Sequence, residues 1–382
     1  MRLAVTKTKF DTTSINTTII NVACIIVCVL LIAYNKTAML AATKAFEIWL
    51  TAVMPALFPF FICTSIMQKN GIFESSKASP LVSIFVLFFA SAISGAPSGA
   101  RLMSNINERY KLDDGTTSTL TALCNMVSPT FIIGTVSFAM LGSIQYAIPI
   151  MVGHYLSSII LLTAYLFRNK NRINKCMQSI SKPRNKPDSS KILIDSILAS
   201  GVSILKIGGT IIFFMVFTEV INKAGLLDLI LKPLALLGLR IDVLKSIVVG
   251  VLEMANGSYS VSQLSGMSHS LTCALICFVI TFSGLCIMTQ SMSFLRLNQK
   301  KYIASKLICA VLAFVLAYLA SEIILPDSIT TSGLIHGGLE NSKIFTNNLF
   351  ALLSIVSASI LGVATIYLSC IIKNRKRMER SR

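Results

Sequence analysis

Charged side chains are scarce in this sequence, and acidic ones are the scarcest. Only 13% of the 382 residues are charged, whereas soluble domains carry about a quarter. Just 16 residues are acidic against 34 basic ones, while 54% are hydrophobic. This composition excludes an ordinary soluble domain. Several runs of about 20 apolar residues are long enough to cross a hydrocarbon core of roughly 30 Å, so we predict an all-α polytopic membrane protein.

Residues that build metal sites and catalytic centres are also few. The three histidines, at 154, 269 and 336, share no ligand spacing, and nine of the ten cysteines lie in apolar runs, where small core side chains are expected. Only Cys176 lies in a polar segment, so no disulfide framework is implied. No P-loop, H-E-x-x-H motif or nucleophile elbow is found. We therefore expect no enzyme, no metal and no cofactor, and leave open a coupling Na⁺ or H⁺.

The net charge of +18 is concentrated at three places. Half of the basic residues lie in the first nine residues, in the segment 168–191 and in the tail "KNRKRMERSR". Basic segments that flank spans mark the cytoplasmic side and can contact anionic lipid. No soluble stretch is long enough to form a nucleic-acid-binding domain. We therefore expect a lipid bilayer as the partner, no nucleic acid, and an apolar run at 17–34 that is the first span and not a signal peptide.

The apolar runs predict ten elements, five on each side of the basic segment. If both termini and that segment are cytoplasmic, each half must cross the membrane an even number of times, so one element per half should enter and leave on the same side. The short elements 80–95 and 243–256 are the candidates for such re-entrant hairpins or broken helices, because they run into "SGAPSGA" and "EMANGSYS". The ten elements are 17–34, 46–68, 80–95, 118–140, 143–168, 193–222, 243–256, 270–295, 302–325 and 347–372.

A faint internal repeat accompanies this parity. "FFICTSIMQKNGI" at 60–72 resembles "FFMVFTEVINKAGL" at 213–226, and "SGAPSGA" occupies the place in the first half that "EMANGSYS" occupies in the second. The first span precedes the first repeat and the last span follows the second, so an even number of crossings in each half gives the two repeats opposite orientations in the membrane. Inverted repeats are a transporter architecture. The predicted organisation is an N-terminal tail and first transmembrane helix (1–44), a first repeat (45–168), a basic cytoplasmic loop (169–191), a second, inverted repeat (192–325), and an extracytoplasmic loop, last span and basic tail (326–382).

Inverted repeats place a binding site near the membrane midplane, where broken helices meet. The helix N-termini that such breaks create suit an anion. Pro129 should kink its helix and free carbonyl groups beside Asn125. The candidate substrate-binding residues near the breaks are Ser94, Gly95, Pro97, Ser98, Gly99, Arg101, Asn125, Ser128 and Thr130 in the first repeat, and Lys206, Glu253, Asn256, Gly257, Ser258, Ser283, Gly284 and Gln290 in the second.

Each candidate also has a purely structural interpretation. Gly and Ser in membrane helices commonly serve close packing. Arg101 and Lys206 can extend their charges to the membrane interface. Glu253 is the only acid within its element, and an ionisable group at membrane depth is costly, so it is the strongest single functional candidate.

The motifs "PALFPFFICTSIMQKNGI", "SGAPSGARL", "NMVSPTFIIG", "VLEMANGS" and "FSGLCIMTQ" occur in this order over about residues 45–325. In these residues the chain resembles the sporulation integral membrane proteins of the nucleoside-recognition, or Gate-domain, family, whose wider relatives include nucleoside transporters. The family pattern "S-G-Y-P-S-G-A-K" reads "SGAPSGAR" here, with Ala96 in place of the aromatic residue and Arg101 in place of the lysine.

The resemblance implies two inverted repeats with re-entrant hairpins and export of dipicolinic acid from the mother cell across the outer forespore membrane. Arg101 or Lys206 would then pair with a carboxylate of this small organic anion, and Glu253 would bind a coupling cation or proton or hold a basic neighbour. The alternatives are a nucleoside-type or other small-metabolite carrier and a non-transporting sporulation membrane scaffold. A homo-oligomer or a sporulation membrane partner is left open.

Overall fold

The computed structural model describes residues 12–69, 80–173, 189–235 and 238–325. The described residues form helices and no strands, which confirms the predicted all-α class. The elements are α1 (Thr12–Ala33), α2 (Asn35–Ile48), η1 (Trp49–Val53), α3 (Met54–Lys69), α4 (Pro80–Ser94), α5 (Ser98–Tyr110), α6 (Asp114–Cys124), η3 (Phe131–Met140), η4 (Ile144–Tyr146), α7 (Ala147–Arg168), α9 (Ser189–Lys223), α10 (Leu226–Ala235), α11 (Ile241–Leu252), α12 (Met254–Ser262), α13 (His269–Phe282), α14 (Gly284–Met292) and α15 (Gln299–Ile324).

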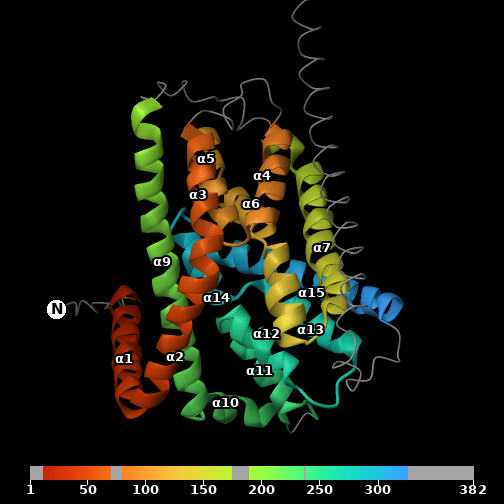
Figure 1. The fold of residues 1–382 in the computed structure, drawn as a ribbon. Helices are drawn as coiled ribbons and strands as arrows, with labels where there is room; N and C mark the ends of the chain where they lie inside the picture. The colour runs from red at the N-terminus through yellow and green to blue at the C-terminus, as the bar shows by residue number, and fades with distance from the viewer. Residues whose placement is uncertain (1–11, 70–79, 174–188, 236–237, 326–382) are drawn as a thin grey trace, which may run out of the picture.

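Four of the described helical stretches are long and apolar enough to cross a membrane. They comprise residues 144–168, 191–223, 269–292 and 299–324. Because α9 has 35 residues, it extends over about 52 Å and runs along the height of the molecule, with α1 and α2 beside its lower half (Figure 1). The predicted last span, 347–372, lies outside the described residues.

The first predicted span is organised differently from the expectation. α1 ends at Ala33, and the chain turns by 95° into α2. Residues 20–51 are long and apolar enough to cross a membrane only when the two bent helices are counted together. The prediction treated 17–34 as a span with a loop after it. The physical reason is that α2 packs along α9, where the Trp49 indole N–H at its end donates to the Ile204 carbonyl (3.1 Å) and the ring fits over Gly208.

Both short elements of the prediction fold back as helical hairpins. In a straight helix, residues seven or eight apart are separated by more than about 10 Å along the axis. Here a methyl group on Gly99 would lie 2.5 Å from the Ser91 hydroxyl, and one on Gly257 would collide with the Gly250 backbone. The chain therefore reverses between α4 and α5 and again between α11 and α12. Figure 1 shows the first hairpin in the upper half of the molecule and the second in the lower half.

Two further predicted elements, 118–140 and 270–295, are kinked instead of continuous. The first kink separates α6 from the next helix at residues 125–128, and Pro129 opens the helix that follows, where its missing N–H costs nothing. At the second kink, Ser283 and Gly284 both adopt a positive φ, of 70° and 71°, between α13 and α14. We refer to residues 125–128 as the first kink and to Ser283–Gly284 as the second kink.

The core forms where α7, α13 and α15 pack along one another. Small residues allow this approach: a methyl group on Gly153 of α7 would lie 2.7 Å from the Ala313 carbonyl and from the Cys277 sulfur. A continuous buried cluster includes residues of η3, α7, α13 and α15, so the two halves of the sequence share one core. These helices form the frame against which the hairpins and kinks are placed.

Candidate functional site where the broken helices meet

Each hairpin packs against the kink of its own half through glycine. In the first half, Gly99 lies against the Cys124 carbonyl and the Asn125 backbone, and a methyl group on Gly95 would lie 3.0 Å from the Ser128 side chain. In the second half, Gly257 and Gly284 both lie against the backbone around Gly250. The candidate residues Gly95, Gly99, Gly257 and Gly284 therefore have a packing role, in which backbone approaches backbone.

Lys306 of α15 connects the two kinks. Its side chain is 2% exposed, and its ammonium donates to the Asn125 carbonyl (2.7 Å), the Thr281 carbonyl (3.2 Å) and the Ser283 hydroxyl (3.0 Å). The freed carbonyl beside Asn125, predicted from Pro129, is thus confirmed. In a continuous helix the Asn125 carbonyl would accept the N–H of residue 129, but proline has none.

His154 of α7 forms a second connection between the kinks. Its Nε2 accepts the Val127 backbone N–H (3.0 Å), so in the neutral ring the proton is on Nδ1, which donates to the Thr281 hydroxyl (2.8 Å). The ring is fully buried. Lys306 and His154 together attach the middle of both broken helices to the frame helices α15 and α7.

Arg101 lies one turn into α5 and has an incomplete set of partners. Its guanidinium stacks on the Phe61 ring at 4.4 Å, and Nη2 donates to the Ser200 hydroxyl at 3.4 Å. The buried Nη1 has no hydrogen-bond partner, and neither has the hydroxyl of Ser98. Within the described ranges, no carboxylate forms an ion pair with Arg101. The first hairpin therefore presents a cation whose charge is not compensated.

Glu253 is the residue at which the chain reverses between α11 and α12. Its carboxylate accepts the backbone N–H groups of Ala255 (3.0 Å) and Asn256 (2.7 Å), which makes it the N-cap of α12. The side chain is 6% exposed, and in the described part of the chain it forms no ion pair. The donors that the described residues supply to Glu253 are therefore backbone N–H groups in the first turn of its own helix and not the basic neighbour that was one of the expected alternatives.

Other predicted polar residues at the hairpins and kinks remain partly unpaired. The Gln290 amide donates to the Cys286 sulfur one turn earlier in α14 (3.3 Å). Buried polar atoms without a partner occur on Gln290 (Oε1), Asn256 (Nδ2), Ser258 (Oγ) and Asn125 (Oδ1). A buried polar group without a partner is costly, so these atoms are candidates for contact with a polar ligand.

The remaining predicted polar residues make local contacts. Ser94 donates to the Ala90 carbonyl (2.9 Å), and the hydroxyls of Ser128 and Thr130 lie 2.9 Å apart, with Thr130 exposed. Pro97 lies buried directly before α5. Lys206 does not join the site: its side chain is exposed on α9, away from the buried kinks. α9 is apolar on nearly every side, so hydrophobic periodicity does not show which of its faces is exposed, and the sequence could not place Lys206 outside the site.

The sequence interpretation missed Lys306 and His154. The signal for Lys306 was present, because it is a lysine inside the apolar run 302–325, and the rule that selected Glu253 applies to it equally. His154 was considered only as a metal ligand. In the described ranges no cluster of three metal-ligating side chains occurs.

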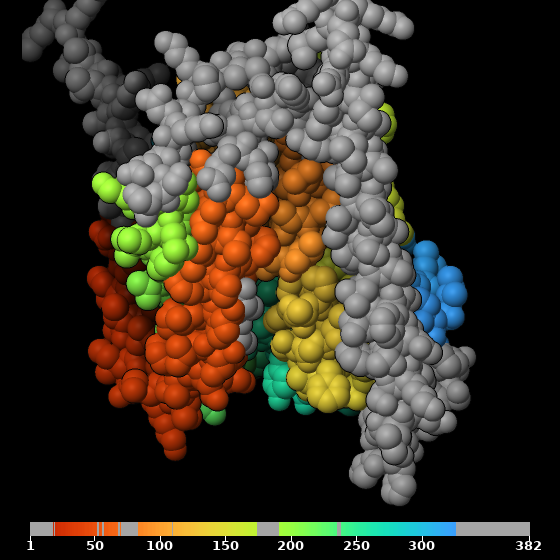
Figure 2. Space-filling view, turned by 45° about the horizontal axis from the view of Figure 1, so that its top comes forward, coloured from red at the N-terminus to blue at the C-terminus, as the bar shows by residue number. Residues whose placement is uncertain are grey.

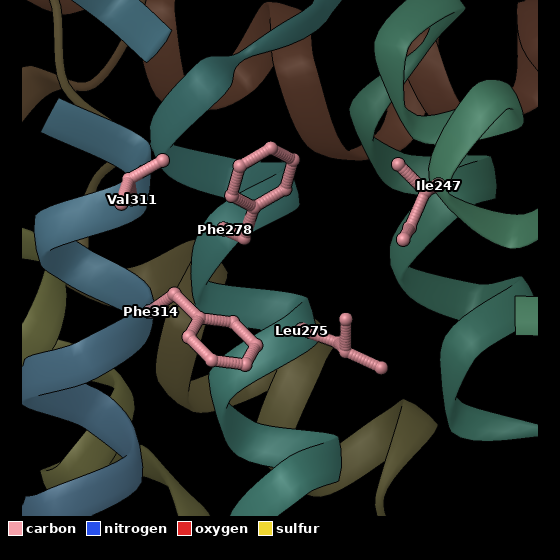
Figure 3. Close-up of a pocket in the computed structure, with 5 residues that line it drawn as sticks. All are labelled: Ile247, Leu275, Phe278, Val311 and Phe314. Atoms are coloured by element: carbon pink, nitrogen blue, oxygen red, sulfur yellow. The ribbon is translucent and has the colours of Figure 1, made fainter. Parts of the chain in front are cut away.

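An apolar pocket of about 260 Å³ lies apart from the kinks, between α11, α13 and α15. Figure 3 shows its lining, which consists of Ile247, Leu275, Phe278, Val311 and Phe314. It offers no donor or charge to an anion.

The surface of the molecule is hollowed between orange α3 and the yellow segment beside it, and green residues of the second half are visible at the base of the hollow (Figure 2).

The chain is similar to a membrane protein of spore formation. It is 24% identical over 290 residues to the sporulation integral membrane protein YlbJ of Bacillus subtilis (strain 168), and the alignment covers 68% of this chain and 71% of that protein. This confirms the resemblance inferred from the motifs at the level of a sporulation integral membrane protein. No family model and no solved structure matches the chain.

Proposed function

Taking as premise the similarity of this chain to a sporulation integral membrane protein, we propose that it is a carrier of small organic anions with dipicolinate as its substrate. In this proposal it acts in the outer forespore membrane and moves dipicolinate from the mother cell toward the forespore. The two hairpins would enter the membrane from opposite sides, as inverted repeats do, and alternate access to a site at the breaks.

The observation that carries the proposal is the unsatisfied guanidinium of Arg101. Arg101 is partly buried, and its Nη1 is a buried donor without a hydrogen-bond partner, which is unfavourable; an anion bound there would satisfy it. The flat face of the guanidinium is occupied by Phe61, while Nη1 is free to donate. Arginine pairs with carboxylates through parallel hydrogen bonds, and dipicolinate carries two carboxylates.

The surroundings of Arg101 also suit the ring of such a substrate. The Phe61 ring that stacks on the guanidinium contacts Phe294 edge to face in turn, with centroids 6.5 Å apart. Ala96 replaces the aromatic residue of the family pattern, but Phe61 still provides an aromatic ring beside Arg101 of the first hairpin. The unpaired Ser98 hydroxyl offers a further donor.

A nucleoside-type carrier is the second candidate, and a specific observation favours it. Asn256 and Ser258 of the second hairpin and Gln290 of α14 each have an unpaired amide or hydroxyl atom. Such groups suit sugar hydroxyls or a base edge as well as a carboxylate. The two candidates differ in whether the cation of the first hairpin is needed.

The deciding experiment measures uptake of labelled dipicolinate into proteoliposomes that contain the purified full chain. We expect Arg101→Ala to lower the uptake efficiency by about 10- to 100-fold, the loss of one charge-assisted hydrogen-bonded pair, and Arg101→Lys to retain part of it. Lys206→Ala is the matched control, a cation removed from an exposed position on a membrane helix, and should transport as the wild type does.

The outcomes separate the candidates. Uptake by Arg101→Ala at the wild-type rate would refute the assigned site. Uptake of uridine or adenosine, unaffected by Arg101→Ala and without uptake of dipicolinate, would favour the nucleoside carrier. If neither compound is transported and neither raises the melting temperature in detergent, the scaffold alternative is favoured, since a ligand of the folded state must stabilise it.

A further inference from the structure

The ammonium of Lys306 is surrounded by oxygen atoms, none of which carries a formal charge. Two are backbone carbonyls, of Asn125 and Thr281, and one is the hydroxyl of Ser283. Among the described residues no carboxylate forms an ion pair with Lys306. A lysine that merely stabilised the fold would be expected to pair with an acid when buried this deeply.

The local sequence explains why these oxygens are available. Pro129 supplies no N–H for the Asn125 carbonyl. The positive φ angles of Ser283 and Gly284 end α13, so the Thr281 carbonyl does not enter a regular i→i+4 bond and accepts instead from Lys306 and from the Ser283 hydroxyl (3.2 Å). The three oxygen ligands are therefore supplied by the two kinks and not by α15.

Carbonyls freed at unwound helices, together with hydroxyls, are the ligands by which membrane carriers hold monovalent metal cations. We propose that the two kinks form a monovalent-cation site, that the tethered ammonium of Lys306 occupies it permanently, and that removal of this side chain opens the site to Na⁺ or K⁺. The lysine thus takes the place of a dissociable metal cation at the junction of the two broken helices.

The neighbouring groups are consistent with a site for a single positive charge. His154 is held in the neutral form by the Val127 N–H, and its Nδ1 proton points to the Thr281 hydroxyl and not to the ammonium. The side-chain amide of Asn125 donates to the Ser291 hydroxyl (2.9 Å), so Asn125 contacts Lys306 through its uncharged backbone carbonyl. The inference concerns binding alone and does not depend on the proposed function.

The test is the thermal unfolding of the purified full chain in detergent, in NaCl or KCl against choline chloride at constant ionic strength. We expect Lys306→Ala to melt lower than the wild type in choline, and Na⁺ or K⁺ to raise its melting temperature saturably, by about 3 °C or more. The wild type should not respond, because its site is already filled.

Two control variants isolate the effect. Lys306→Met removes the charge but fills most of the vacated space, so it should not respond to Na⁺ or K⁺. Lys300→Ala removes an exposed lysine from the same helix and should behave as the wild type does. A melting temperature of Lys306→Ala that is the same in choline, Na⁺ and K⁺ would overturn the proposal.

Failure of Lys306→Ala to fold would also be informative. Lys306→Ser, whose hydroxyl adds a fourth oxygen, would then be purified in a high concentration of NaCl or KCl. Recovery in these salts but not in choline supports the proposal. Loss of both small variants in all salts, while Lys306→Met is recovered, contradicts it, because a metal cation should substitute for the ammonium.

Discussion

The two hairpins of this protein have similar backbone packing and differ in the hydrogen-bond partners of their charged side chains. In both, glycine brings the reversal against the kink of the same half, and Lys306 connects the two kinks. At the second hairpin, each carboxylate oxygen of Glu253 accepts a backbone N–H group from the first turn of its own helix. The charge at the first, on Arg101, keeps a buried donor without a partner. The comparison teaches that a charge at membrane depth indicates a ligand only where local backbone cannot satisfy it.

The hairpins also differ in how tightly they close, and this difference provides the largest expected effect. Gly257 faces the backbone of Gly250, which cannot yield, whereas Gly99 faces a serine hydroxyl as well as backbone. We expect Gly257→Ala to lower the free energy of unfolding by about 3 kcal/mol or more, and Gly99→Ala by about 2 kcal/mol. Melting temperatures in detergent measure both.

Gly209→Ala is the control for these substitutions, because a methyl group there meets no atom within 4 Å. As an alanine in an exposed helix it should be neutral or slightly stabilising. Equal losses for Gly257→Ala and Gly209→Ala would mean that the second hairpin is not closed as described.

Glu253 provides an intermediate effect that sharpens the contrast in charge. If its carboxylate acts as a helix cap, Glu253→Ala should cost about 1 kcal/mol, and Glu253→Gln, which keeps one acceptor oxygen, should cost less. Dipicolinate uptake by Glu253→Gln should stay within about twofold of the wild type, unlike that of Arg101→Ala. A tenfold loss of uptake in a folded Glu253→Gln protein would show that the carboxylate also handles a ligand or a proton.

The smallest effect concerns Asp113, which caps α6 outside the apolar part of its element. It accepts from the Gly115 and Thr116 N–H groups and lies 3.1 Å from an Arg172 nitrogen. Partial burial raises the pKa of Asp113, but the bonds from Thr116 and Gly115 and the charge of Arg172 outweigh it and lower the pKa below 3.8. The ionised cap therefore stabilises the fold above that value, and the stabilisation is lost as the pH falls through the depressed pKa.

We expect Asp113→Ala to cost about 0.5 kcal/mol near neutral pH, and the difference from the wild type to shrink in acid. Asp114→Ala, at the next and exposed position, is the control and should change stability by less than half as much. A difference between Asp113→Ala and the wild type that does not change with pH would assign the effect to packing and not to the ionised cap.

The sequence alone determined the helical membrane class, the two short broken elements and the kink at Pro129. These follow from local physics: apolar length sets the span, while proline and glycine act on the backbone beside them. It also singled out Arg101 and Glu253 as charges that required an explanation. Lys306 could have been found by the same rule.

Only the tertiary structure decided which of these charges has a partner. Lys306 contacts a carbonyl 181 positions away in the chain, and the Ser200 hydroxyl reaches Arg101 across 99 positions. Lys206 and Arg101 were both candidate cations, yet Lys206 is exposed on α9 and Arg101 is partly buried against Phe61. Hydrophobic periodicity assigns no direction to helices that are apolar on every side, so their orientation is set by packing between distant segments.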